Sequence, residues 1–354
     1  MNVTKRLQKL RQLLAEKNIE ALLVSQAENR YYLSGFNGSA GYLLITADRA
    51  LLATDSRYIE QAARQAPNYQ LFKSNSELPK WLPEFLCGLN LKELAFEAEH
   101  TSFWRYNQIK DIVESLRITL KPVNDIVENL RIIKDTDELA LIEQAVAISD
   151  AAMEHIRNTA RIGMSELEVS WEIEKYMREH GSQTIPFEVI VAAGCNAAMP
   201  HHQPCEHSIV EGEPIIIDIG AKCGEYASDL TRTICLGQED EQFHRIYNTV
   251  LQAQIVAEEN IRADMSGSEA DRSARSVIEK AGYGNQFGHG LGHGIGLVVH
   301  EAPSISTNSQ YTLQNGMIFT IEPGIYLHEW GGVRIEDSVV LENGKVRVLS
   351  AASK

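Results

Sequence analysis

The chain has 354 residues, and at roughly 100–200 residues per domain this length predicts two domains. Apolar residues make up 44% and charged residues 23%, which predicts a large buried core and argues against a disordered chain. The formal net charge of −15 makes nucleic acid and anionic membrane surfaces poor partners.

The N-terminal sequence and the cysteines both indicate a cytoplasmic protein. The first residues, MNVTKRLQKLRQLLAEKN, are charged throughout and do not resemble a signal peptide, and no run of about 18 apolar residues predicts a membrane span. The five cysteines are odd in number and form no C-x-x-C motif, so we expect free thiols in a reducing cytosol. We also expect these small apolar side chains to be buried.

The first third of the chain predicts a small α/β unit. Apolar residues at helical spacing (Leu7, Leu10, Leu13 and Leu14) lead to strand candidates at 21–24 and 41–46. Small residues between 34 and 41 predict a turn, and a helix is expected after TDSRY at 54–58. Residues 121–134 are expected to cross between the domains, and we place the boundary after residue 124.

Two features of this unit allow two interpretations each. Asp55 and Arg57 of TDSRY either close a strand and start a helix or shape a substrate entrance. Tyr31, Tyr32 and Phe36 are either ordinary core aromatics or walls of a pocket for a proline ring.

The rest of the chain predicts helices followed by strands. Asp135 with Glu138 and Ser165 with Glu168 have the spacing of capping boxes, and Gly181 suits the end of the second helix. Strand-like runs follow at 214–219, 230–236, 317–321 and 332–341.

A faint internal repeat occurs in this part. EHIR at 154–157 is echoed by ENIR at 259–262, and IEK at 173–175 recurs at 278–280, both at an offset of 105 residues. Such short echoes also arise by chance. A true duplication predicts two similar halves that face one another, with a site between them that collects ligands from both.

Four carboxylates stand beside strongly apolar strands. Asp218 lies at the end of the apolar strand in PIIIDIG, Asp229 precedes LTRTICL, and Glu322 follows FTI. Glu336 lies two residues after Arg334 in GGVRIED, so these two side chains share one face of a strand. Burying four carboxylates together is prohibitive unless cations compensate them.

A glycine-rich segment, GHGLGHGIGLVVHE, adds His289, His293 and His300. It is not the H-E-x-x-H zinc helix, because the glutamate is absent and the glycines disfavour a helix. The glycines flanking the first two histidines allow close approach of the backbone and leave the imidazoles accessible.

Charge counting predicts a two-metal site. The four carboxylates carry four negative charges, which two divalent ions neutralise, and one neutral histidine completes the set. Such ligands favour Mn²⁺, Co²⁺, Fe²⁺ or Zn²⁺ over a thiolate-bound metal. Two ions roughly 3.5–4 Å apart activate water and polarise a carbonyl, which is the logic of two-metal hydrolysis.

The order Asp218, Asp229, His293, Glu322, Glu336 resembles the ligand set of the M24 metallopeptidases, which have the pita-bread fold. The segments MPHH, SDLTRT, GHGIGLVVHE, EPGIY and GGVRIED resemble the aminopeptidase P/prolidase branch, and YLSGFNGSAG and TDSRY resemble its creatinase-like domain. The resemblance implies an α/β (α+β) protein with a creatinase-like domain at 1–124 and a pita-bread catalytic domain with pseudo-twofold halves at 125–354.

The resemblance also implies residue roles. The five ordered residues would bind the metal ions, and Glu322 would in addition shuttle a proton. His201 and His300 would hydrogen-bond the substrate and the tetrahedral intermediate. His289 would stand at the rim of the site, and Arg334 would orient a ligand carboxylate.

His202 departs from the pattern, because many relatives carry glycine there. The resemblance assigns the catalytic role to His201, because its distance of 17 residues from Asp218 matches the family. We expect His202 either at the substrate rim or as a solvated loop histidine.

The implied activity is hydrolysis of the bond between an N-terminal residue and proline, whose ring nitrogen carries no N–H. The nearest alternative is an Xaa-Pro dipeptidase (prolidase) restricted to dipeptides. Methionine aminopeptidase shares the five ligands but typically lacks such an N-terminal domain. From other classes, a non-catalytic peptide-binding relative usually loses ligands, and a creatinase-like hydrolase works without metal.

The resemblance implies two divalent metal ions as cofactors, with Mn²⁺ expected and Co²⁺, Zn²⁺ or Fe²⁺ as alternatives. It implies proline-containing peptides as substrates and a homodimer as the assembly. No nucleic-acid or membrane partner is expected.

Overall fold

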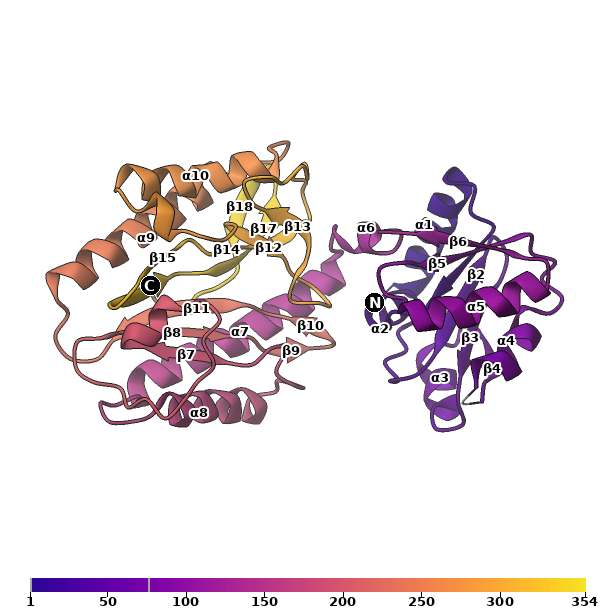
Figure 1. Cartoon of the computed structure of the whole chain (residues 1–354), viewed down its shortest axis with the longest axis horizontal. Coiled ribbons are helices and arrows are strands. Elements are labelled where there is room, and N and C mark those ends of the chain that lie inside the picture. Colours follow the sequence, from indigo (N-terminus) through magenta and orange to yellow (C-terminus); the bar gives the residue numbers. More distant parts are fainter. Residues whose placement is uncertain (1, 76) are drawn as a thin grey trace. The chain divides into compact units, whose positions relative to one another are not determined.

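Figure 1 shows the computed structural model of the chain, which describes residues 2–75 and 77–354. Contacts divide it into two compact units, Met1–Arg131 and Ile132–Lys354. The division lies inside the segment that was expected to cross between domains.

The first unit is built on a six-stranded mixed sheet with the order β4-β3-β2-β1-β5-β6. Its strands are β1 (Ala21–Val24), β2 (Tyr42–Thr46), β3 (Ala50–Thr54), β4 (Gln70–Lys73), β5 (Glu93–Glu97) and β6 (Thr119–Val123). Its helices are α1 (Val3–Glu16), α2 (Ala27–Ser34), α3 (Ile59–Gln65), α4 (Leu78–Leu86), α5 (Phe103–Ser115) and α6 (Glu128–Arg131). The parallel pair β5 and β6 is joined through α5, as a parallel crossover requires.

The structure shows where most residues of the two open features of this unit lie. Arg57 forms an ion pair with Asp55 at 2.8 Å in the turn between β3 and α3, so the TDSRY segment closes a strand and precedes a helix. Tyr32 and Phe36 are buried. The Tyr32 hydroxyl donates to the carbonyl oxygen of Leu130, which identifies it as a core residue of this unit.

The second unit consists of two helix pairs with strands between them (Figure 1). The helices are α7 (Thr136–Thr159), α8 (Glu166–Glu179), α9 (Glu241–Asn260) and α10 (Gly267–Lys280), with short 3-10 helices η1 (Gly194–Ala198) and η2 (Gly284–Gln286). One sheet has the order β11-β8-β7, and its strands are β7 (Ile190–Ala193), β8 (Pro214–Ile219) and β11 (Leu230–Cys235). The other has the order β13-β12-β14-β17-β18.

The strands of that second sheet are β12 (Gly292–Gly294), β13 (Glu301–Ile305), β14 (Ile318–Ile321), β17 (Asp337–Glu342) and β18 (Lys345–Val348). Two separate hairpins pair β9 (Lys222–Cys223) with β10 (Tyr226–Ala227) and β15 (Gly324–Leu327) with β16 (Gly331–Arg334).

The internal duplication is real, but the predicted offset of 105 is wrong. Ser165 caps α8 and Ser266 caps α10, each in a capping box, and these two residues are 101 apart. In this register the buried faces agree, because Ile173 matches Ala274 and Met177 matches Ile278. The IEK echo is therefore fortuitous, since it pairs residues one helical turn out of step.

Strand alternation turns the carboxylates away from the helices. Ile215, Ile217 and Ile219 of β8 pack in the same core cluster as residues of α7 and α8. Asp218 lies between Ile217 and Ile219 and therefore points to the opposite face. Side chains alternate in the same way at the end of β14, so that Ile321 lies in the core and the next residue, Glu322, lines a cavity.

The predicted strand at 332–341 is two strands. β16 pairs with β15, whereas β17 pairs with β14, and the break falls at Ile335 and Glu336. The backbone N–H of Glu336 donates to the carbonyl oxygen of Thr231 in the other half at 3.0 Å. The break thus redirects the chain from one pairing partner to another, while Arg334 and Glu336 still share the face predicted for them.

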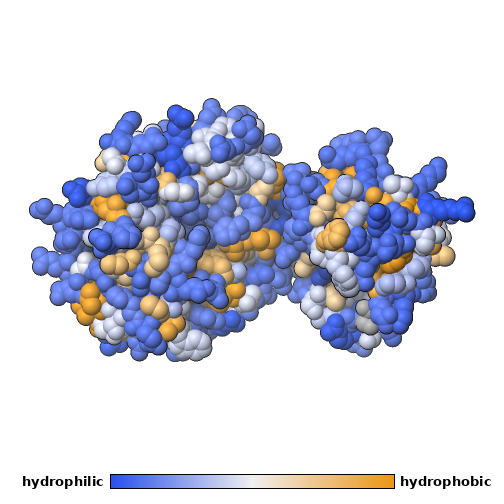
Figure 2. All heavy atoms as spheres, viewed as in Figure 1, coloured by the Kyte–Doolittle hydropathy of each residue, from blue (hydrophilic) through white to orange (hydrophobic). Residues whose placement is uncertain are grey.

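The surface is mainly polar. On the face seen in Figure 2, hydrophilic side chains cover most of both units and apolar side chains form scattered patches. The five cysteines are free, as predicted, but the expectation that they are buried is wrong, because Cys87, Cys195 and Cys205 are exposed and the other two are half-buried. Within the described residues, no helix is both long and apolar enough to cross a membrane.

Candidate metal centre

A cavity of about 720 Å³ in the second unit brings together every site residue that the sequence predicted. These residues are His201, Asp218, Asp229, His289, His293, His300, Glu322, Arg334 and Glu336. Both halves contribute, because Asp218 lies in β8 and Asp229 directly precedes β11 of the first sheet, whereas His293 lies in β12 and Glu322 directly follows β14 of the second. The cavity lies between the two halves, where the sequence predicted a site.

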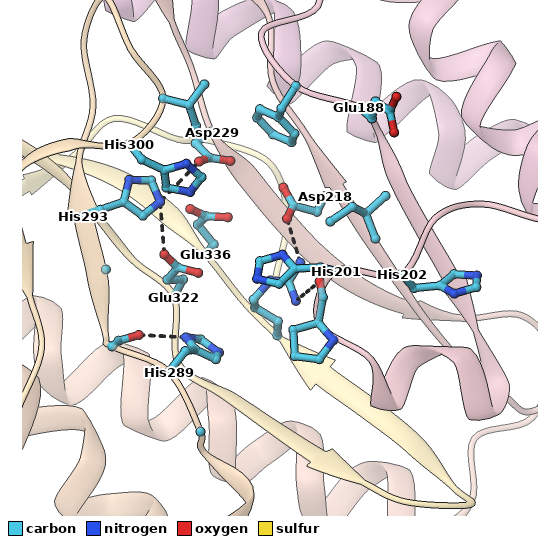
Figure 3. A pocket seen from close by; sticks show the side chains of 18 of the residues that line it. Glu188, His201, His202, Asp218, Asp229, His289, His293, His300, Glu322 and Glu336 are labelled. Atoms are coloured by element: carbon cyan, nitrogen blue, oxygen red, sulfur yellow. Dashed lines mark hydrogen bonds and ion pairs between the residues drawn. The ribbon is translucent and has the colours of Figure 1, made fainter. Parts of the chain in front are cut away.

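Four side chains, those of Asp229, His293, Glu322 and Glu336, lie close together in this cavity (Figure 3). His293 Nε2 lies 3.6 Å from Asp229 Oδ2 and 3.3 Å from Glu322 Oε1. The ligand atoms of Asp229, His293 and Glu336 all lie within 4.8 Å of one another, a spacing that suits coordination of a common ion.

The electrostatics of this cluster demand positive charge. Burial, reinforced by neighbouring carboxylates, raises the pKa of Asp229 and of Glu336 well above the ordinary range. Burial opposes the charge of His293, but Glu322 outweighs it and raises the pKa of the imidazole to about 9. Burial likewise opposes ionisation of Glu322, yet its hydrogen bond with His293 lowers the pKa of this carboxylate to about 2. Without cations, protons take their place.

Two buried carboxylate oxygens identify where cations fit. Asp218 Oδ1 and Glu336 Oε1 have no hydrogen-bond partner among the described residues. Such orphaned acceptors are costly in a protein interior and are ordinary when a metal ion fills the remaining lone pair. The donor set of four carboxylates and one imidazole therefore fits two divalent ions.

Comparison with known proteins agrees with this geometry. Residues 140–343 match metallopeptidase family M24, and residues 6–133 match the creatinase/prolidase N-terminal domain. The chain belongs to the M24 metallopeptidases. Its hydrolase chemistry and its two-domain architecture, a creatinase-type domain followed by a pita-bread domain, follow from these matches.

Several M24 relatives resemble this chain over its whole length. The chain is 35% identical to an Xaa-Pro dipeptidase of Pyrococcus horikoshii, over 98% of this chain and 97% of the relative. A solved structure of an Xaa-Pro dipeptidase from Bacillus anthracis matches with a TM-score of 0.96 and 37% identity, covering 100% of this chain and 99% of that one. The X-Pro aminopeptidase from Thermotoga maritima matches with a TM-score of 0.90 and 35% identity, covering 98% of each chain.

Hydrogen bonds from neighbouring side chains orient three of the carboxylates in this cavity. Arg334 donates to Asp218 Oδ2 at 2.6 Å. Thr231 donates through its hydroxyl to Glu336 Oε2 at 2.6 Å, and Thr320 does the same to Glu322 Oε1 at 3.1 Å. Each carboxylate thus keeps one orientation, which fixes ligand geometry in metal sites.

Sequence reasoning missed these two threonines and Tyr326. The Tyr326 hydroxyl accepts from Arg334 at 3.1 Å and lies 2.9 Å from His289 Nε2, so it links the two side chains. The signal for Tyr326 was present, since it ends the EPGIY motif. Thr231 and Thr320 could have been found by strand parity, because each lies two residues along the strand from a carboxylate, Asp229 and Glu322 respectively.

The histidines differ in their surroundings. Burial lowers the pKa of His289 and of His300 below the ordinary value of 6.5, so both imidazoles are neutral at pH 7. The His300 ring lies 4.2 Å from the His293 ring, measured between centroids. His289 lines the cavity wall and is held by Tyr326 and by the carbonyl oxygen of Gly290.

The glycines around His293 are required by close packing, as predicted. A Cβ on Gly292 would collide with the carbonyl oxygen of Thr320, and one on Gly294 with that of Ala302. The short strand β12 therefore fits between β13 and β14 only because its residues around His293 lack side chains.

His202 fits neither of its two predicted settings fully. It lines the cavity, but its ring points away from the carboxylate cluster (Figure 3). Its side chain is only 11% exposed, and Nε2 lies 2.7 Å from Oε2 of the buried Glu166. The solvated-loop expectation is wrong, because a buried carboxylate holds the ring.

Proposed function

We propose that this chain is a metal-dependent exopeptidase that hydrolyses the bond between an N-terminal residue and proline, as an Xaa-Pro aminopeptidase. The observation that carries the proposal is the convergence of four carboxylates and His293 on one cavity, with two buried carboxylate oxygens left without partners. Full-length relatives that bear the names Xaa-Pro dipeptidase and X-Pro aminopeptidase support this substrate class.

Asp218, Asp229, His293, Glu322 and Glu336 would hold two divalent ions. When bound, such ions lower the pKa of water and polarise a carbonyl group. Glu322 lies at the centre of the cluster, 3.3 Å from His293, where a carboxylate can accept a proton from the attacking water and pass it to the prolyl nitrogen. Thr320 holds the carboxylate of Glu322 in place for this transfer.

Two histidines supply hydrogen bonds to the reacting carbonyl. His300 lines the cavity beside His293, and His201 lines it from the other half. A neutral imidazole N–H can donate to the oxygen that becomes negative during attack, without competing with the cations for the carboxylates. His289 and Tyr326 form the adjacent wall, where they keep Arg334 directed at Asp218.

The scarcity of cationic side chains among the described residues that line the cavity favours an aminopeptidase over a dipeptidase. A dipeptide presents the carboxylate of its proline, which needs a positive partner when it is buried. Among the described residues that line the cavity there is no lysine, and Arg334, the one arginine, is already bonded to Asp218 and Tyr326. A longer peptide carries no charge at that carbonyl and needs no such partner.

We further propose Mn²⁺ as the physiological metal, a homodimer as the assembly and the cytoplasm as the location. The oxygen-rich ligand set supports Mn²⁺, although Co²⁺, Zn²⁺ and Fe²⁺ accept the same ligands. Metal analysis of protein purified from its native cells, and light scattering of the same sample, test the first two points.

The proposal is tested with enzyme stripped of metal, reloaded with Mn²⁺ and offered Ala-Pro-Ala and Ala-Pro. We expect cleavage of the Ala–Pro bond in the tripeptide and loss of that activity in the stripped enzyme. Cleavage of Ala-Pro alone would establish a prolidase. No cleavage of either peptide with Mn²⁺, Co²⁺ or Zn²⁺ would overturn the proposed function.

A further inference from the structure

A buried carboxylate outside the metal centre belongs to Glu166. It is the first residue of α8 and has no exposed surface. Oε1 accepts from the backbone N–H of Ala193 at 2.8 Å and from Asn196 Nδ2 at 2.9 Å. Oε2 lies 2.7 Å from His202 Nε2 and accepts from the backbone N–H of Cys205 at 3.0 Å.

All these donors belong to one segment, residues 193–205. It leaves β7 at Ala193, passes through η1 and reaches Cys205. Glu166 therefore holds both ends of the segment and two points within it. His201 lies inside this segment, directly before the anchored His202, and lines the cavity. Fixing His202 leaves the neighbouring His201 few ways to move.

The hydrogen bonds keep Glu166 charged despite its burial. Burial raises the pKa of this carboxyl, but the donors from Ala193, Asn196, His202 and Cys205 outweigh it and lower the pKa overall. Hydrogen bonds to an ionised acceptor are about twice as strong as neutral ones. The segment is thus tied to α8 by charge-assisted bonds.

The set Glu166, His202 and Cys205 has the residue types of a metal site, with ligand atoms within 4.8 Å of one another. The lone pairs of Glu166 are already in use, however. Two of its donors are backbone N–H groups, which cannot be displaced without moving the segment. This arrangement favours an anchor over a third metal site.

The duplicated half provides an internal comparison. At the position equivalent to Glu166, α10 begins with Gly267. The backbone contacts there are alike, because the N–H of Glu166 donates to His207 and that of Gly267 to Tyr311. A Cβ on Gly267 would collide with Ser309, so the second half has no room for an anchor at this position. The helix start needs no carboxylate for folding, and the carboxylate is present only where the adjacent segment carries His201.

We propose that Glu166 is a positioning residue that holds His201 in the cavity through His202 and the backbone of residues 193–205. The inference rests on the proposed function only for the role of His201. The anchor itself is a property of the folded chain and can be measured without any substrate.

The test compares Glu166→Gln with Glu168→Gln. Glutamine keeps the size of the side chain but has one acceptor oxygen, so it leaves at least one backbone N–H of the segment unpaired. Glu168 belongs to the capping box of the same helix, accepts from Ser165 N and has no hydrogen bond to the segment among the described residues, which makes it a matched control.

Hydrogen exchange gives the readout that is independent of activity. We expect faster amide exchange across residues 193–205 in Glu166→Gln and unchanged exchange there in Glu168→Gln. Unchanged exchange in Glu166→Gln would overturn the anchor. Loss of one equivalent of bound metal in Cys205→Ser would also overturn it, in favour of a metal site. This measurement stands even if no Xaa-Pro peptide is cleaved, so failure of the function and failure of the anchor are distinguishable.

Kinetics on Ala-Pro-Ala test the coupling to His201. We expect Glu166→Gln to lower kcat about 10–100-fold, because small displacements of a catalytic group have effects of this size, with KM nearly unchanged. In a His201→Ala background the same substitution should have little further effect. His202→Gln, whose amide can replace the Nε2 donor, should retain more activity than His202→Ala. Full additivity of Glu166→Gln and His201→Ala would overturn the proposal.

Discussion

The two halves of the second unit share a scaffold and differ in chemistry. In each half a capped helix packs on a small antiparallel sheet, and two carboxylates lie beside its central strands. The first half adds His201 on a long segment anchored by Glu166. The second half adds His293 on β12. On both sides of His293 this strand is packed too closely for any residue but glycine, at Gly292 and Gly294.

The two halves fix their histidines through different acidic side chains. Both halves place a buried acidic side chain near the backbone that carries their histidines. In the second half this residue is Asp271, which accepts from Leu291 N at 3.0 Å and binds Arg275 at 2.7 Å. Arg275 in turn donates to the carbonyl oxygen of His289. The scaffold thus fixes the carboxylates symmetrically, whereas separate anchors fix the histidines.

The largest effect is expected from removing one metal-ligand charge in either half. Asp229→Asn and Glu336→Gln should each lower kcat/KM on Ala-Pro-Ala at least about 10³-fold, because each contribution to the metal centre is worth several kcal/mol. The metal-free variants should be no less stable than the metal-free parent, since burial already disfavours both charges. Kinetics and thermal unfolding check both points.

The exposed Glu154→Gln serves as a control for these two variants and should behave like the parent. If one ligand variant kept full activity while the other lost it, the two halves would not contribute equally to the metal centre.

Metal uptake should depend strongly on pH. The pKa of His293, raised to about 9, means that its imidazole carries a proton at pH 7 in the metal-free cluster, and the raised pKa values of Asp229 and Glu336 also favour their protonated forms. A ligand imidazole must be neutral and a ligand carboxylate ionised, so binding releases protons. Mn²⁺ affinity should therefore rise with pH up to about 9. Calorimetry in two buffers of different ionisation enthalpy measures the release, and a binding enthalpy independent of buffer would contradict it.

A smaller effect is expected from changing the packing at equivalent positions of the two halves. Gly292→Ala forces a Cβ against Thr320 and should lower the free energy of unfolding by about 1–3 kcal/mol, as overpacking does. It should also weaken Mn²⁺ binding, because His293 is the next residue. Val191→Ala, at the equivalent position of the first half, should reduce stability without weakening metal binding. Denaturant unfolding and metal titration together make the comparison.

The smallest effect is expected from removing the helix caps that both halves share. Ser165 and Ser266 both cap a helix in a capping box. Ser165→Ala and Ser266→Ala should each lower the free energy of unfolding by about 1 kcal/mol. Activity at a temperature well below the unfolding transition should not change. A large loss of activity in only one of the two variants would mean that one cap does more than hold its helix.

Much of the site could be predicted from the sequence because its signals are local. A carboxylate beside an apolar strand, as at Asp218, is visible in a few residues, and so is a histidine between glycines, as at His293. Glu166 gave no such signal. It stands in an ordinary capping sequence, and its partners lie 27–39 residues further along the chain.

By itself the sequence determined many of the elements and the candidate residues that line the cavity, because helix caps, strand alternation and charge next to apolar runs act over short stretches of chain. The tertiary structure decided the register of the duplication, the break before Asp337, the exposure of the cysteines and the anchoring of His202. Each of these depends on which distant backbone group a donor or acceptor finds. The backbone N–H of Glu336 donates to the carbonyl oxygen of Thr231 in the other half, and no local sequence pattern predicts this partner.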